Sequence, residues 1–255
     1  MQNLMGRIRR CAEDYNMICA GDKIAVGVSG GKDSLSLLYL LAALRRYYPV
    51  PYELQAVTID RGLPGMDFSP VAELCAKLDV PYQIKKTEIG PIIFEYRHEK
   101  NPCSMCAKMR RGALNDVLLE LGCNKIALGH HFDDVIETIL MSMVYGGQIQ
   151  TMMPKLHSRN YAGMELIRPL YMVKEADIIR WVEQNDLHFI RCACRFTESY
   201  EGLEKKGEVS KRQEMKELIA KFRATNPNIE NNIFKSVYNV NLRTVIQYEY
   251  KGKKY

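Results

Sequence analysis

Short apolar runs that alternate with helical patterns constrain the fold of this chain more than any other feature. Four runs have the length of buried strands, at 23–28, 52–59, 82–86 and 125–128. Helical spacing follows each of them, once after a linker, at 35–48, 69–78, 104–121 and 130–146. This alternation predicts an α/β domain with a parallel, Rossmann-like sheet. Ligands of such sheets bind at the carboxyl ends of the strands, where two glycine-containing turns of this sequence fall.

Three parts are expected along the 255 residues. Residues 1–20 predict a short N-terminal helix, residues 21–187 the α/β domain, and residues 188–255 a C-terminal helical region with a basic tail. Within the second part, residues 151–170 indicate an irregular excursion or a hairpin, and residues 174–185 a helix. The α/β domain therefore has small, mostly helical extensions at both ends.

The sequence carries no membrane-spanning or export signal. No apolar run approaches the roughly 18 residues that span a bilayer, and the N-terminus lacks the apolar core of a secretory signal. We therefore expect a cytoplasmic protein without membrane contact, whose eight cysteines are thiols or metal ligands rather than a disulfide framework. Four of them are expected to be buried structural thiols, Cys11, Cys19, Cys75 and Cys123.

The turn after the first strand is built to hold an anion. It consists of Ser29, Gly30, Gly31, Lys32, Asp33 and Ser34. Adjacent glycines let several backbone N–H groups face one anion, and the helix that follows adds its partial positive charge. Lys32 supplies a full charge, but its Asp neighbour and the glycine spacing differ from a Walker A loop. The turn predicts a phosphate site, and a plain strand–turn–helix junction is the alternative.

Two cysteine pairs form the second signal. Cys103 and Cys106 are separated by two residues, and Cys192 and Cys194 by one. Thiolates at the first spacing bind metal ions or iron–sulfur clusters, and a redox dithiol uses the same spacing. The pair predicts a metal or cluster site, with a dithiol and incidental cysteines as alternatives.

The third signal is the turn after the fourth strand. It runs Gly129, His130, His131, Phe132, Asp133 and Asp134. Adjacent carboxylates at a helix start suit Mg²⁺ that is bound together with phosphates. Helix capping by Asp133 is the alternative, and it is compatible with the metal. The two histidines are further candidate metal ligands.

The positions of the basic residues favour an RNA partner more strongly than the net charge of the chain does. There are 36 Lys and Arg against 30 Asp and Glu, a modest net charge of +6. Basic residues gather at the two ends of the chain, Arg7, Arg9 and Arg10 and Lys251, Lys253 and Lys254. They also flank both cysteine pairs, as Lys108, Arg110, Arg111, Arg191 and Arg195. Solvated faces are the ordinary explanation of any one cluster, but positive charge beside both pairs would place RNA phosphates there.

These stretches together resemble one family. SGGKDS is the signature of the PP-loop ATP pyrophosphatases. With CSMCAKMRRG, KIALGHHFDDVIET, YGG, PKL and IRPL in this order and spacing, the chain resembles the tRNA 2-thiocytidine synthetases, the TtcA family, over about residues 20 to 194. The resemblance implies a PP-loop fold, ATP and Mg²⁺, and an oxygen-sensitive [4Fe–4S] cluster on three cysteines. It also implies an activity: adenylation of the C2 oxygen of cytidine 32 in tRNA and its replacement by sulfur.

The resemblance also assigns roles to residues. The six residues Ser29 to Ser34 would bind the ATP phosphates, with Asp60, Gly129 and His130 near the nucleotide. Four residues would be catalytic, Lys32, Arg110, Asp133 and Asp134, the two aspartates by holding Mg²⁺ or orienting the activated oxygen. Cys103 and Cys106 would be cluster ligands. The family's late pair has two intervening residues, whereas Cys192 and Cys194 enclose only one, so either is the third ligand and Cys194 is favoured.

The implied partners are tRNA, ATP, a second copy in a homodimer, and a sulfur donor, either a cysteine desulfurase or free sulfide. Two alternatives keep the fold: a thiolase for another tRNA base, and a ligase like the tRNA lysidine synthetases. The ligases need no cysteine constellation, so the first pair argues against that alternative. A nucleotide- or metal-sensing binding protein is the alternative from another class.

Overall fold

The computed structural model describes residues 2–96, 102–158, 161–185, 210–250 and 252–255. The chain divides into two compact units. The first unit takes residues up to Asp133 and resumes at Met153, and the second takes Asp134–Met152 and the chain from Val209 onward. We describe each unit separately.

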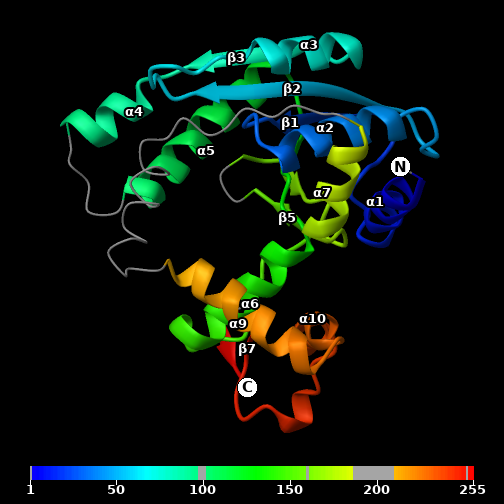
Figure 1. Ribbon diagram of the computed structural model, residues 1–255, viewed down its shortest axis with the longest axis vertical. Coiled ribbons are helices and arrows are strands. Elements are labelled where there is room, and N and C mark those ends of the chain that lie inside the picture. Colours follow the sequence, from blue (N-terminus) through cyan, green and yellow to red (C-terminus); the bar gives the residue numbers. More distant parts are fainter. Residues whose placement is uncertain (1, 97–101, 159–160, 186–209, 251) are drawn as a thin grey trace. The chain divides into compact units, whose positions relative to one another are not determined.

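A mixed six-stranded sheet organises the first unit (Figure 1). Its strands lie in the order β3-β2-β1-β4-β6-β5. The bounds are β1 Asp22–Gly27, β2 Tyr52–Asp60, β3 Tyr82–Lys86, β4 Lys125–Ala127, β5 Lys155–His157 and β6 Glu165–Ile167. All neighbours pair in parallel except β5, which pairs antiparallel with β6. The parallel Rossmann-like sheet is confirmed, and the region 151–170 supplies a hairpin that extends it.

Helices accompany these strands at the expected places. In the first unit they are α1 Gln2–Asp14, α2 Lys32–Leu44, α3 Ser69–Lys77, α4 Ile89–Pro91, α5 Pro102–Glu120 and α7 Glu175–Gln184. A π-helical segment, Ile92–Tyr96, follows α4 where the sequence indicated only a linker. Helix α6, Phe132–Gly146, begins in the first unit and continues in the second.

The central strand explains why the two turns meet. Ile24, Ala25 and Val26 of β1 are fully buried, as expected for a parallel strand covered on both faces. Gly27 at the end of β1 pairs with Val57 of β2, and Val26 pairs with Ala127 of β4. The turns after β1 and β4 therefore leave neighbouring strands at the same edge of the sheet.

Besides α6, the described part of the second unit contains two α-helices, the short 3-10 helix Leu242–Thr244 and a small hairpin. Their bounds are α9 Lys211–Thr225, α10 Ile229–Tyr238, and the antiparallel strands β7 Glu249–Tyr250 and β8 Lys253–Lys254. Asn226 is the C-cap of α9 and Asn228 the N-cap of α10, so the two helices are separate.

A buried network of charged side chains lies at the other end of the strands, where β1, β4 and β6 begin. The Lys125 ammonium is only 3% exposed and lies 2.9 Å from Asp22 Oδ2 and 2.8 Å from Glu165 Oε2. It also donates to the carbonyl of Met17 at 3.0 Å. Burial raises the pKa of Asp22 and of Glu165, but hydrogen bonds and the charge of Lys125 outweigh it, so both pKa values are lowered. Burial lowers the pKa of Lys125, and its two carboxylate partners raise it by more.

This network predicts an acid-sensitive stability. Because the pKa values of Asp22 and Glu165 are lower in the folded chain than in the unfolded chain, their contribution is complete above about pH 4.5 and is lost as pH falls through the folded values. We expect the free energy of unfolding, measured in urea, to drop by about 2 kcal/mol between pH 6 and pH 3. Because the pKa of Lys125 is raised in the folded chain, the contribution of Lys125 to stability is instead lost as pH rises above the ordinary lysine pKa. Asp22→Asn should lower stability at pH 7 and flatten the acid limb, and an unchanged acid limb would exclude Asp22 as a source.

The structural cysteines are mostly buried, as predicted. Cys11, Cys75 and Cys123 are buried, and burial raises the pKa of Cys11 to about 12 and that of Cys75 to about 11. For Cys19 the prediction is wrong, because this residue lies exposed in the turn between α1 and β1.

Candidate nucleotide site

The turn after β1 is held in shape by its own two serines. Gly30 has a φ of +86°, a backbone conformation that favours glycine, and Gly31 is the N-cap of α2. The backbone N–H of Ser29 donates to Ser34 Oγ at 3.1 Å, and that hydroxyl donates to the carbonyl of Gly31 at 3.0 Å. These bonds bend the chain around the N-terminus of α2, where backbone N–H groups can receive an anion.

Lys32 lies at the start of α2 between two carboxylates. Its Nζ is 2.7 Å from Glu175 Oε1 and 3.1 Å from Asp33 Oδ2. Burial lowers the pKa of Lys32, but these two partners raise it by more, so the pKa ends above its ordinary value. The ammonium therefore remains fully charged at neutral pH.

Gly129 brings the second motif against the first. A Cβ at this position would lie 3.0 Å from the carbonyl carbon and oxygen of Asp33 and 3.1 Å from the backbone N of Ser34. Only a residue without a Cβ allows such close contact of two backbones. The turns after β1 and β4 are thus in direct contact, as their positions in the sheet predicted.

Polar side chains gather behind this contact. His131 is 4% exposed, with its Nε2 3.9 Å from Asp33 Oδ1 and its Nδ1 3.7 Å from Asp133 Oδ2. Asp133 Oδ2 accepts the backbone N–H of Glu175 at 2.7 Å and so caps α7, whose Lys174 N-cap provides no side-chain bond. Asp33 Oδ1 is buried and makes no hydrogen bond among the described residues. A buried carboxylate oxygen without a hydrogen bond, beside a turn that is predicted to bind phosphate, fits an oxygen ligand of Mg²⁺.

Asp134 has a different environment from Asp133 and belongs to the second unit. Its Oδ1 lies 2.8 Å from Arg212 of α9. One turn further along α6, Glu137 is 2% exposed and lies 3.5 Å from Arg212 and 3.7 Å from Lys216. The adjacent carboxylates of the motif therefore have separate partners, the N-terminus of α7 and a basic face of α9.

Two other residues expected near the nucleotide, His130 and Asp60, accept hydrogen bonds from other parts of the chain. His130 Nδ1 accepts a hydrogen bond from Arg168 Nε at 3.3 Å, and Arg168, 8% exposed, also donates to the carbonyl of Met153. Asp60 at the end of β2 accepts the N–H of Gly62 at 3.0 Å. An acceptor Nδ1 leaves the His130 proton on Nε2 in the neutral ring.

Helix α5 carries the first cysteine pair in its first two turns, because it begins at Pro102 rather than at 104. Positions 103, 106 and 110 follow the three- and four-residue spacing that places them on one side of a helix. The Cys106 thiol is partly buried, and Arg110 is exposed and makes no ion pair within the described residues. Cys106 therefore offers a partly buried thiol on the side of α5 that positions 103 and 110 share.

The late cysteines cannot be placed beside this pair. Cys192 and Cys194 lie outside the described residues, as does the side chain of Cys103. In the part of the chain that is described, no three His, Cys, Asp or Glu side chains converge on a common metal position. The cluster ligands therefore stay predictions.

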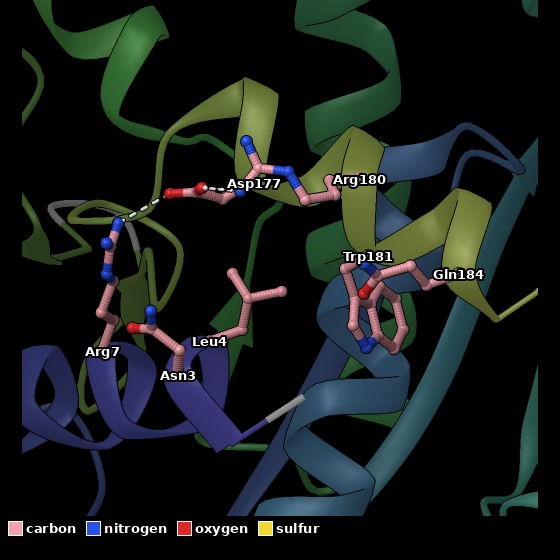
Figure 2. A pocket seen from close by; sticks show the side chains of 7 residues that line it. All are labelled: Asn3, Leu4, Arg7, Asp177, Arg180, Trp181 and Gln184. Carbon is pink, nitrogen blue, oxygen red and sulfur yellow. Dashed lines mark hydrogen bonds and ion pairs between the residues drawn. The ribbon is translucent and has the colours of Figure 1, made fainter.

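A separate cavity of about 110 Å³ lies between α1 and α7 (Figure 2). Its lining residues are Asn3, Leu4, Arg7, Asp177, Arg180, Trp181 and Gln184. Figure 2 shows Arg7 facing Asp177 across the opening, where their charged groups are 2.7 Å apart. None of the expected site residues lines it.

Comparisons with known proteins agree with this geometry. A family model described as PP-loop domain matches residues 4–201. The tRNA-cytidine(32) 2-sulfurtransferase of Geobacter sulfurreducens is 35% identical over 97% of this chain and 93% of its own length. That of Geobacter metallireducens is 37% identical, over 95% of this chain and 91% of its own. The chain belongs to the tRNA-cytidine(32) 2-sulfurtransferase family of PP-loop proteins. The resemblance drawn from the motifs is confirmed.

A solved structure shares the fold of this chain. It is the U34-tRNA thiolase NcsA from Methanococcus maripaludis with its [4Fe-4S] cluster, with a TM-score of 0.71 and 21% identity. The match covers 93% of this chain and 80% of that one. Across the described residues, no helix is long and apolar enough to cross a membrane.

Two residues that contact the candidate nucleotide site were not named as site residues from the sequence. Glu175 and Arg168 contact Lys32 and His130, yet neither lies in a glycine-rich turn or a cysteine pair. A signal existed for Glu175, since an acidic residue opens the helix that follows the sheet's last strand. For Arg168 the signal was the IRPL stretch, of which it is the arginine, directly after the buried end of β6.

Proposed function

We propose that the protein is an ATP- and iron–sulfur-cluster-dependent tRNA sulfurtransferase. It replaces the C2 oxygen of a cytidine, at tRNA position 32, with sulfur and converts ATP to AMP and pyrophosphate. ATP-dependent tRNA thiolation is the activity of the family to which the chain belongs. The observation that carries the proposal is the backbone contact of Gly129 with Asp33 and Ser34, which joins the two motifs into one site.

The chain's own residues would perform the activation of the base. The C2 oxygen attacks the α phosphate, the bond to the β phosphate breaks, and pyrophosphate leaves with that electron pair. Phosphoryl transfer needs positioning and charge neutralisation. The N–H groups at the start of α2 and the Lys32 ammonium would supply both, and Nε2–H of His130 is a further donor near the nucleotide. When sulfur attacks C2, the bond between C2 and the original oxygen breaks, and the adenylyl group attached in the first step leaves as AMP with that oxygen.

The proposal requires two further groups, Mg²⁺ and an iron–sulfur cluster. Mg²⁺ would be held through Asp33 and Asp133 on the first unit, with Asp134 as the further carboxylate of the motif, and the buried Asp33 Oδ1 supports this. Cys103, Cys106 and Cys194 would hold the cluster, with Cys192 as the alternative third ligand, and Arg110 would lie near the reacting base. When bound by these cysteines, a [4Fe–4S] cluster would supply the sulfur that replaces the C2 oxygen.

Analysis of the nucleosides in treated tRNA tests this proposal. Protein purified without oxygen is incubated with unmodified tRNA, ATP, Mg²⁺ and sulfide, and the digested nucleosides are identified by mass spectrometry. We expect 2-thiocytidine, with one pyrophosphate released per sulfur incorporated. Thiouridine would instead assign another base, and pyrophosphate release without sulfur incorporation would favour ligase chemistry.

The basic residues of α5 would contact the tRNA backbone. Lys108 and Arg111 are exposed and make no ion pair among the described residues. In contrast, Arg9 and Arg10 of the N-terminal cluster pair with acids four residues ahead, at 2.8 and 3.5 Å. Phosphate contacts release counterions, so each lost contact reduces the salt dependence of binding.

We therefore expect Lys108→Gln with Arg111→Gln to weaken tRNA binding several-fold and to reduce the slope of log affinity against log salt by about 1 to 2. Arg9→Gln with Arg10→Gln removes the same charge and should leave the slope unchanged. The measurement is fluorescence anisotropy with labelled tRNA from about 50 to 200 mM salt. Equal slopes for the two double variants would assign the RNA surface elsewhere.

The remaining partners belong to the same proposal. We propose a cytoplasmic homodimer, with a cysteine desulfurase or free sulfide as the sulfur donor. In the proposed organisation, residues 1–20 and 188–255 flank a catalytic domain at 21–187. Sedimentation at micromolar concentration would give the mass of a dimer rather than that of a 29.3 kDa chain.

A further inference from the structure

Glu175 links the two motifs of the nucleotide site, although neither motif contains it. It is the first residue of α7. Its Oε1 lies 2.7 Å from Lys32 Nζ, and its backbone N–H donates to Asp133 Oδ2 at 2.7 Å. One residue thus contacts the turn after β1 with its side chain and the turn after β4 with its backbone.

The side-chain contact determines how Lys32 is held. The side chains of Lys32, Asp33 and Glu175 are 29%, 30% and 26% exposed, so water screens their charges only in part. A lysine has many rotamers, and ordering them opposes the binding of an anion. The bond to Glu175 restricts Lys32 before any anion arrives. It also places a negative charge beside the ammonium that would meet the phosphates.

We propose that Glu175 is a positioning residue, which holds the Lys32 ammonium in place for the phosphates of ATP. This inference rests on the proposed function, because it takes ATP as the ligand of the turn. Its hydrogen bond orders Lys32 and so favours the reaction. Its charge repels the phosphates and so weakens the binding of ATP itself. The two effects have opposite signs and different chemical origins.

Substitution can separate the two effects. Glu175→Gln keeps an oxygen that accepts the Lys32 hydrogen bond and removes the charge, whereas Glu175→Ala removes both. We expect Glu175→Ala to lower kcat/KM for ATP about tenfold, since Lys32 keeps only its longer bond to Asp33 and is less ordered. We expect Glu175→Gln to keep kcat within about threefold of the wild type and to lower the Kd of ATP about threefold or more.

The readouts are tRNA-dependent pyrophosphate release by the anaerobically reconstituted enzyme and ATP binding by calorimetry without tRNA. Glu183→Gln is the matched control, because Glu183 is an exposed acid of the same helix and should change neither readout. A structural role in α7 would lower the melting temperature and would not tighten ATP binding in Glu175→Gln.

The inference is overturned if Glu175→Ala stays within twofold of the wild-type kcat/KM, or if Glu175→Gln binds ATP no more tightly than the wild type. Failure of the proposed function looks different. In that case the wild type releases no pyrophosphate with tRNA, while the ATP Kd of the two variants still decides the role of Glu175.

Discussion

Cys106→Ala should abolish sulfur transfer and leave ATP binding intact. The Cys106 thiol lies partly buried near the start of α5, whereas serines of the turn itself make the hydrogen bonds that shape the turn after β1. A ligand lost from a three-cysteine cluster site removes the cluster, so iron per chain should fall from about four to well below one. We expect thiolation to drop by at least about 100-fold, with the Kd of ATP changed less than twofold.

The matched control is Cys19→Ala, which removes an exposed thiol from the turn between α1 and β1. It should keep the iron, the visible absorbance and the activity. Among the late cysteines, Cys194→Ala should resemble Cys106→Ala and Cys192→Ala should resemble the control. Zinc in place of iron, or full thiolation by the Cys106 variant under strict anaerobiosis, would refute a cluster mechanism.

The sequence was sufficient to predict that both motifs lie at carboxyl ends of strands of one parallel sheet, and the strand order of the structure makes them neighbours. Each follows a strand of the same parallel sheet, and the carboxyl ends of neighbouring parallel strands share an edge. Local glycine chemistry then predicts the turn itself, including the left-handed Gly30. These features depend on residues that are close in sequence or on a regular pattern.

The partners of the site were not predictable in the same way. Glu175 is 143 positions from Lys32, and an acidic residue in the first turn of a helix is ordinary, because it interacts favourably with the helix dipole. Arg168 lies in the IRPL stretch, but that stretch does not reveal that its guanidinium contacts His130, 38 positions away. Cys19 shows the reverse error: an apolar neighbourhood in sequence suggested burial, but the turn in which it lies is exposed. Long-range packing decides these cases, and single-sequence patterns carry little of it.

Replacing Gly129 tests whether the motif contact is needed for function. A Cβ at Gly129 would meet the carbonyl carbon and oxygen of Asp33 at 3.0 Å and the backbone N of Ser34 at 3.1 Å. Those atoms belong to the first turn of α2, which the buried β1 and the serine hydrogen bonds hold, so they have little room to retreat. Gly129→Ala must therefore shift one turn against the other by a few tenths of an ångström.

We expect this shift to lower kcat/KM for ATP by about tenfold to a hundredfold, because positioning errors well below 1 Å already slow phosphoryl transfer. The free energy of unfolding should fall by about 1 to 3 kcal/mol from overpacking. Gly6→Ala is the control, since a Cβ at this exposed position of α1 meets nothing within 4 Å and should be neutral or slightly stabilising. ATP titrations and urea unfolding of both variants give the two quantities. If Gly129→Ala binds and turns over ATP like the wild type, the two turns tolerate separation and the contact is a packing detail, not a requirement of the site.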